Sequence, residues 1–155
     1  MNKILKILIC LYLCVFLFAC GEEYADTNGA DNYTLQTITD SNIINLELGA
    51  SGLGYKEQNI AGVVFSNEYY SKNFNGVERI YNTNFILPSD VMIYIGYLTV
   101  DSGNFRMVIV NDDKIIYDVE SGAFNEMLRF DNLKGNFAIH LAGESADFEL
   151  NLEVQ

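Results

Sequence analysis

The chain has 155 residues, and its 21 acidic and 9 basic residues give a formal net charge of −12 at pH 7. A surface this acidic repels phosphate backbones and anionic lipid headgroups, so nucleic acid is excluded as an expected partner. A chain of this length is expected to form one folded domain, kept soluble by its charge.

The N-terminus has the pattern of a signal peptide. Lys3 and Lys6 form a short basic region, and the run from Ile7 to Ala19 is almost wholly apolar. As a helix this run would span about 20 Å, which is shorter than the roughly 30 Å hydrocarbon core of a bilayer. The pattern therefore predicts a signal-peptide h-region over residues 1–19 and not a membrane-spanning helix.

The apolar run ends in Leu17-Phe18-Ala19-Cys20, which resembles the lipobox of bacterial lipoproteins. The resemblance implies a diacylglycerol on the Cys20 sulfur and cleavage after Ala19. It also implies lipid anchoring to the cell membrane or outer membrane, with the chain exposed outside the cytoplasm. The alternative is an ordinary secretory signal with an incidental cysteine, but ordinary cleavage prefers an A-x-A-like site. Cys10 and Cys14 would leave with the signal peptide, so no disulfide is expected in the mature domain.

Residues 20–32 are small, polar and acidic, and they predict a flexible tether. Residues 33–155 predict an all-β domain, an antiparallel β-sandwich. Its clearest strand is the last, where Phe148, Leu150, Leu152 and Val154 alternate with polar residues. Further strands are expected near 63–65, 80–87, 92–100, 105–110, 115–119 and 137–141, with turn-forming Gly, Pro, Asn and Asp residues between them.

The C-terminal third also resembles the C-terminal half of small Ig-like sandwich domains of bacterial envelope proteins. The matching stretches are FRMVIVNDDKIIYDV and LRFDNLKGNFAIHLAGESADFELNLEV. The pattern is carried by Leu133, Gly135, Phe137, Ile139, Leu141 and Gly143. Phe137 stands where many such domains have tyrosine, so a tyrosine-corner hydrogen bond is not expected. The resemblance implies an Ig-like architecture and says nothing of function.

No constellation in the sequence predicts an enzyme. The stretch Gly49-Ala50-Ser51-Gly52-Leu53 lacks the last glycine of a nucleophile elbow. The triplet Asp101-Ser102-Gly103 resembles the D-[ST]-G motif of aspartic proteases. The apolar-apolar-Gly element that follows later in that family has no counterpart here. A plain turn therefore explains the triplet better. His140, the only histidine, is expected to face solvent, so no metal or other cofactor is predicted. Loose calcium binding by the acidic turns around 111–113 and 144–149 stays open.

Tyr69, Tyr70 and Phe74 lie in the stretch EYYSKNFNG beside an expected turn. Exposed aromatic side chains there would suit a protein or glycan partner, because they bury a large area at small entropic cost. The alternative is that alternate members complete the core face of a strand. We therefore expect a monomeric, lipid-anchored binding module. The alternatives are a structural spacer or an inhibitor or immunity lipoprotein.

Overall fold

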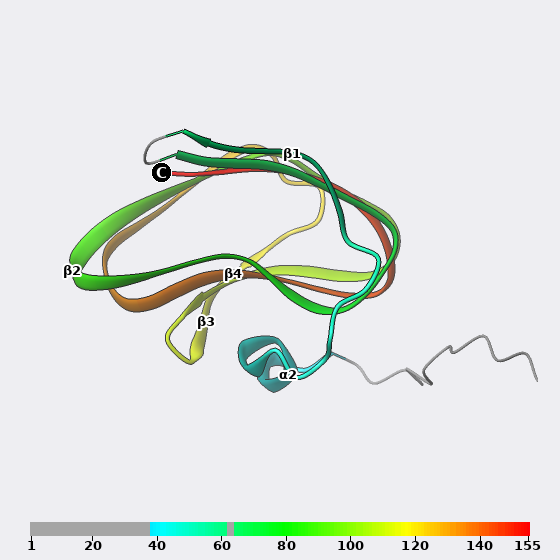
Figure 1. Cartoon of the computed structure of the whole chain (residues 1–155), viewed down its shortest axis with the longest axis horizontal. Helices are drawn as coiled ribbons and strands as arrows, with labels where there is room; N and C mark the ends of the chain where they lie inside the picture. The colour runs from blue at the N-terminus through cyan, green and yellow to red at the C-terminus, as the bar shows by residue number, and fades with distance from the viewer. Residues whose placement is uncertain (1–37, 62–63) are drawn as a thin grey trace, which may run out of the picture. The chain divides into compact units, whose positions relative to one another are not determined.

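The computed structural model describes residues 38–61 and 64–155, which belong to the compact unit Thr37–Gln155. The expected signal peptide (residues 1–19), Cys20 and the expected tether (residues 20–32) lie outside the described residues. The elements are a short helix, α2 (Asp40–Asn45), and the strands β1 (Gly54–Ala61), β2 (Val64–Asn111), β3 (Lys114–Val119) and β4 (Phe124–Val154) (Figure 1). Within the described part of the chain, no helix is long and apolar enough to cross a bilayer.

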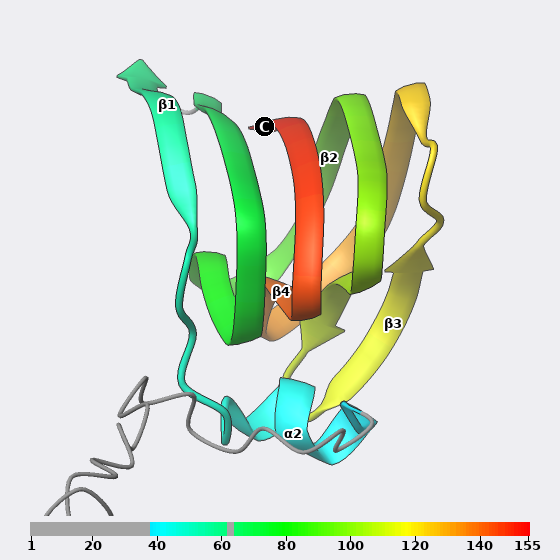
Figure 2. The same cartoon turned by 90° about the vertical axis from the view of Figure 1, so that its right-hand side faces the viewer.

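The antiparallel strands form a sandwich of two layers, because β2 and β4 bend from one layer into the other while staying paired (Figure 1). Layer A contains, in spatial order, β1, 65–71, 148–154, 93–100 and 124–128. Figure 2 shows this order directly, with the red end of β4 between two green segments of β2. Layer B contains, in spatial order, 76–85, 135–144, 104–111 and β3.

This strand order is that of a jelly roll. Successive segments of β2 alternate between the layers, and β4 runs back beside them in the opposite direction. The expected all-β antiparallel sandwich is confirmed, but its order differs from the Ig-like order that the C-terminal pattern implied. In an Ig-like domain the last two strands are neighbours in one sheet, whereas here 135–144 and 148–154 lie in different layers.

The bends occur at positions that the sequence marks as turns. At Asp101-Ser102-Gly103, β2 passes from layer A to layer B, and Gly103 has a φ of +80°. A Cβ on Gly103 would lie 2.3 Å from the backbone oxygen of Ser145, at the matching bend of β4. Glycine is required here because two backbones approach closely in a conformation that other residues avoid.

The core fills the space between the layers. On the last segment of β4, Phe148, Leu150 and Leu152 are fully buried and Val154 is 2% exposed, as the alternation predicts. Phe148 packs against the ring of Phe105, with a centroid distance of 4.3 Å. The remaining buried members of this cluster are Tyr69, Phe74, Val91, Ile93, Ile95, Leu98, Met107, Ile109, Val119, Leu128, Phe137, Ile139, Leu141 and Ala146.

Helix α2 covers part of the outer face of layer B. Its N-terminus is closed by a capping box in which Thr39 and Asn42 each bind the other's backbone N–H, at 3.3 and 3.1 Å. Ile43 is fully buried in a second apolar cluster with residues of layer B. Arg106 of layer B links the helix to the neighbouring strand, with ion pairs of 2.8 Å to Asp40 of α2 and 2.5 Å to Asp118 of β3.

This cover corrects the expectation for His140. The side chain points away from the inter-layer core, as its strand phase predicts, but α2 leaves it only 3% exposed. Its Nδ1 lies 2.9 Å from the Ile43 carbonyl oxygen, so Nδ1 carries the proton and donates it. Burial lowers the pKa of His140, the bond to Ile43 opposes this, and the charge of Arg79 lowers the pKa further.

Candidate functional site

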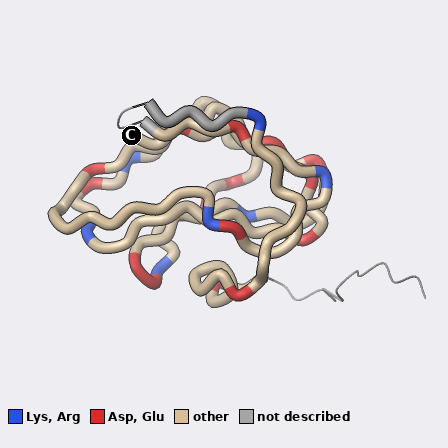
Figure 3. The backbone as a smooth tube through the Cα atoms, in the orientation of Figure 1, with Lys and Arg blue, Asp and Glu red and all other residues tan. Residues whose placement is uncertain are grey.

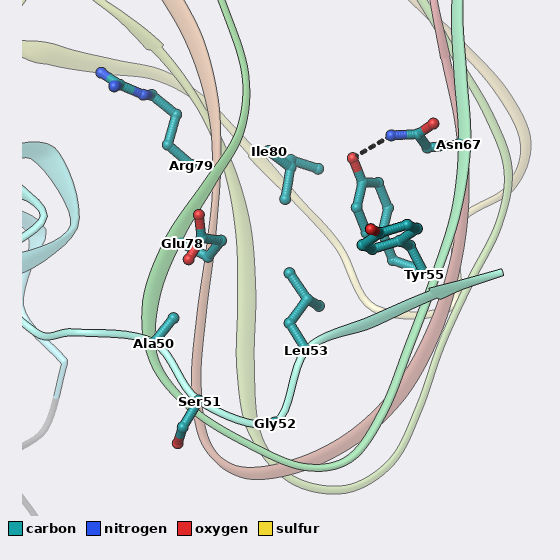
Figure 4. Close-up of a pocket in the computed structure, with 10 residues that line it drawn as sticks. Ala50, Ser51, Gly52, Leu53, Tyr55, Asn67, Glu78, Arg79 and Ile80 are labelled. Atoms are coloured by element: carbon teal, nitrogen blue, oxygen red, sulfur yellow. Dashed lines mark hydrogen bonds between the residues drawn. The ribbon is translucent and has the colours of Figure 1, made fainter. Parts of the chain in front are cut away.

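An open pocket lies at the edge of the sandwich where β1 borders layer A and 76–85 borders layer B. Its volume is about 430 Å³. Figure 4 shows its lining, to which the connection before β1 and both edge segments contribute. The lining residues are Ala50, Ser51, Gly52, Leu53, Tyr55, Asn67, Tyr69, Glu78, Arg79 and Ile80.

The connection before β1 is fixed by hydrogen bonds to β2. Ser51 and Asn75 exchange two backbone hydrogen bonds, of 2.9 and 3.1 Å. The Ser71 hydroxyl donates to the Gly52 carbonyl oxygen at 2.9 Å. Because its backbone groups are paired, this connection is a defined wall of the pocket.

Two tyrosines on neighbouring strands have opposite exposures. Tyr55 of β1 and Tyr69 of β2 are directly opposite in the antiparallel register, so their side chains lie on the same face of layer A. Tyr69 is 5% exposed, whereas Tyr55, on the edge strand, is 66% exposed. Leu53 and Ile80 point toward each other across the pocket (Figure 4). The pocket thus combines an accessible aromatic ring with an apolar interior.

The polar end of Tyr69 is held by a buried hydrogen bond. The side-chain amide of Asn67 donates to the Tyr69 hydroxyl oxygen at 2.6 Å (Figure 4). Burial raises the pKa of Tyr69, the bond from Asn67 opposes this, and the negative charge of Glu78 raises the pKa further. Tyr69 therefore stays a neutral phenol at physiological pH.

Glu78 and Arg79 lie on opposite faces of layer B. The Cα partner of Glu78 is Leu141, a residue of the inter-layer core, whereas the partner of Arg79 is His140, which lies under α2. Since neighbouring residues of a strand alternate between faces, Glu78 is on the face that borders the pocket. In Figure 4, Arg79 extends away from the other labelled side chains.

The three aromatic residues predicted to bind a partner do not form one surface. Phe74 is fully buried and contacts the ring of Phe148, with centroids 5.7 Å apart. The expectation that Phe74 is exposed for a binding partner is therefore wrong. Phe74 instead completes the core face of its strand, which was the alternative. Tyr69 lies in the core and lines the pocket. Tyr70 is 40% exposed on the outer face of layer A, with the Lys56 ammonium 5.6 Å from its ring centroid.

The motifs that resemble catalytic sites remain separate in the structure. Ser51 pairs through its backbone with Asn75, and His140 is bound to Ile43 beneath α2. Asp101 is exposed at a bend between the layers. Among the side chains that the structure describes, no three His, Cys, Asp or Glu residues come together as metal ligands.

Lys and Arg are scattered among Asp and Glu over the described backbone (Figure 3). Lys56 lies within 3.9 Å of Glu68 and Glu149, and Lys72 lies 3.2 Å from Asp147. Arg106 and Arg129 are likewise paired with carboxylates. Among the described residues, no ion pair or side-chain hydrogen bond includes the Glu78 carboxylate.

Tyr55 and Glu78 were not singled out from the sequence. Glu78 shares a strand face with apolar residues. A carboxylate among inward-facing apolar residues is unusual, and the sequence alone could have marked Glu78 as a candidate site residue for this reason. Its juxtaposition with Tyr55 depends on how layers A and B stack, which no local pattern encodes.

The sequence matches no family model, and no curated protein matches it either. One similar solved structure is a family 35 carbohydrate-binding module from Clostridium thermocellum. It has a TM-score of 0.41 and 18% identity, over 70% of this chain and 91% of that chain. Another is the C-terminal CBM6 of LamC, a marine laminarinase from Zobellia galactanivorans, with a TM-score of 0.34 and 8% identity, over 69% and 90%. A likeness of this extent assigns neither a family nor a ligand.

Proposed function

We propose that this protein is a lipid-anchored binding module that takes a saccharide in the pocket beside Tyr55. The observation that carries the proposal is the pocket itself, in which an exposed tyrosine ring, an apolar interior and polar groups converge. Pockets of about 300–1,000 Å³ with a few placed polar groups are typical small-molecule sites. The volume of about 430 Å³ falls in that range.

The lining suits a ligand that has both C–H and hydroxyl surfaces. A sugar ring presents C–H groups on its faces, and the exposed ring of Tyr55 offers a flat apolar surface for stacking. Hydroxyl groups at the ring edge need acceptors and donors. Glu78 supplies carboxylate oxygens that accept such hydrogen bonds, whereas the Ser51 hydroxyl points away from the other labelled side chains (Figure 4). The pocket therefore offers the Tyr55 ring for stacking and the Glu78 carboxylate for hydrogen bonds.

The test is glycan binding by the full-length protein in a detergent without a sugar headgroup. An array identifies a bound saccharide, and titration calorimetry then compares the wild type with Tyr55→Ala. Loss of the stacking surface should weaken binding about tenfold, or ~1.4 kcal/mol. Phe124→Ala is the matched control, because Phe124 is 72% exposed but lies on the other edge of layer A. Absence of any bound glycan, or equal losses in both variants, would refute the proposal.

The anchoring part of the proposal rests on the sequence. The lipobox-like Leu17-Phe18-Ala19-Cys20 supports lipid on Cys20 and a position at the cell membrane or outer membrane, outside the cytoplasm. Cys20→Ala should move the protein out of the membrane fraction. Metabolic labelling with a fatty-acid analogue should mark the wild type and not the variant. An unlabelled wild type would contradict the anchor and leave the pocket proposal intact.

A further inference from the structure

We propose that the ligand carries an ammonium group, which the Glu78 carboxylate receives at the wall of the pocket. This inference rests on the proposed saccharide site and narrows its ligand to amino sugars with a free amine. Three features support it: the position of Glu78, the lack of an ion pair to its carboxylate among the described residues, and the exposed aromatic ring of Tyr55.

The position of Glu78 follows from the register of layer B. Its neighbours Val77 and Arg79 are paired with Ala142 and His140, which are both buried on the outer face beneath α2. Glu78 therefore lies on the opposite face, paired with the fully buried Leu141. Its side chain is half-buried, so its charge is less well screened than that of a fully exposed carboxylate.

None of the ion pairs among the described residues includes Glu78. Lys56, Lys72, Arg106 and Arg129 are all paired with other carboxylates. Arg79 follows Glu78 in sequence but lies on the opposite face, where it faces His140. The negative charge of Glu78 acts on Tyr69, whose pKa is raised mainly by burial and further by this charge.

An ammonium group is the complement of these features. Hydrogen bonds between an ammonium and a carboxylate are about twice as strong as those between neutral groups. The exposed ring of Tyr55 adds an aromatic face, which attracts cations through its quadrupole. The net charge of −12 raises the local concentration of cationic ligands and disfavours anionic ones. An N-acetylated sugar has the same ring and hydroxyl groups but no such charge.

Calorimetry on the full-length protein in sugar-free detergent tests this inference. The probes are glucosamine oligomers and N-acetylglucosamine oligomers of equal length, at a pH where the free amine is protonated. The wild type should bind the free-amine oligomer at least about tenfold more tightly. This preference should shrink between low salt and about 0.5 M salt, since screening weakens ionic contacts.

Glu78→Gln keeps the shape of the side chain and should abolish the preference. Glu120→Gln removes an exposed carboxylate at the turn between β3 and β4 and should preserve it. Circular dichroism checks that both variants fold, and the salt series on the wild type tests the charge even if Glu78→Gln does not fold.

The two proposals fail in different ways. Equal binding of both oligomers, with sensitivity to Tyr55→Ala, would overturn the ammonium inference and leave the saccharide site standing. A preference that survives in folded Glu78→Gln, or that salt does not reduce, would also overturn the inference. If neither these oligomers nor any glycan on the array binds, both proposals are wrong.

Discussion

Leu150 gives the strictest test of the sandwich, because its side chain is fully buried between the layers. Leu150→Ala removes three carbon atoms from the core. At about 0.8 kcal/mol for each buried CH2-sized group, transfer alone gives about 2.4 kcal/mol. The cavity left behind raises the expected loss of unfolding free energy to about 3–4 kcal/mol. Domains of this size have roughly 5–15 kcal/mol in total.

The assay is urea unfolding of the domain from Tyr33 to Gln155, followed by circular dichroism. The midpoint should fall while the slope with denaturant stays unchanged, as for a loss of stability within one folded state. Asn151→Ala is the matched control, because Asn151 lies on the outer face of the same segment and is only partly buried. It should cost less than about 1 kcal/mol. Equal losses at the two positions would refute the inward and outward alternation of this strand.

Two further predictions address the bends and the buried histidine. Gly103→Ala should destabilise the domain in urea more than Gly122→Ala, because both have φ near +80 to +90° but only the Cβ at 103 meets backbone, at 2.3 Å. In both variants the left-handed backbone conformation should lower the unfolding free energy by about 1–2 kcal/mol. Gly103→Ala should lose more because of the steric clash, so equal losses would contradict the close approach of this bend to β4. Because the folded-state pKa of His140 is lowered, the unfolded chain takes up this proton first, and stability should fall as pH drops below about 6.5. His140→Asn should flatten this dependence between pH 7.5 and 5, and an unchanged slope would contradict the buried neutral state.

Local patterns in the sequence determined the class of fold and the direction of many side chains. The alternation from Phe148 to Val154 gave the buried face of the last strand, because side-chain direction follows from a period of two. The turn-forming residues at 101–103 marked a real change of direction. Neither pattern indicates which strands become neighbours, since pairing joins residues far apart in the chain. The jelly-roll order was therefore decided by tertiary structure.

The same limit explains the outcomes at His140, Phe74 and the pocket. Strand alternation correctly placed His140 on the outer face of its strand. It could not show that α2 buries this side chain, because Ile43 of α2, which binds His140, lies 97 residues earlier in the chain. Phe74 looked accessible beside a turn, yet the bend of β2 there directs it onto Phe148. Tyr55 and Glu78 meet at one pocket because the edges of layers A and B stack on the same side. The sequence specified each side chain and its strand face, and the packing of the two layers alone decided which faces are covered and which form a site.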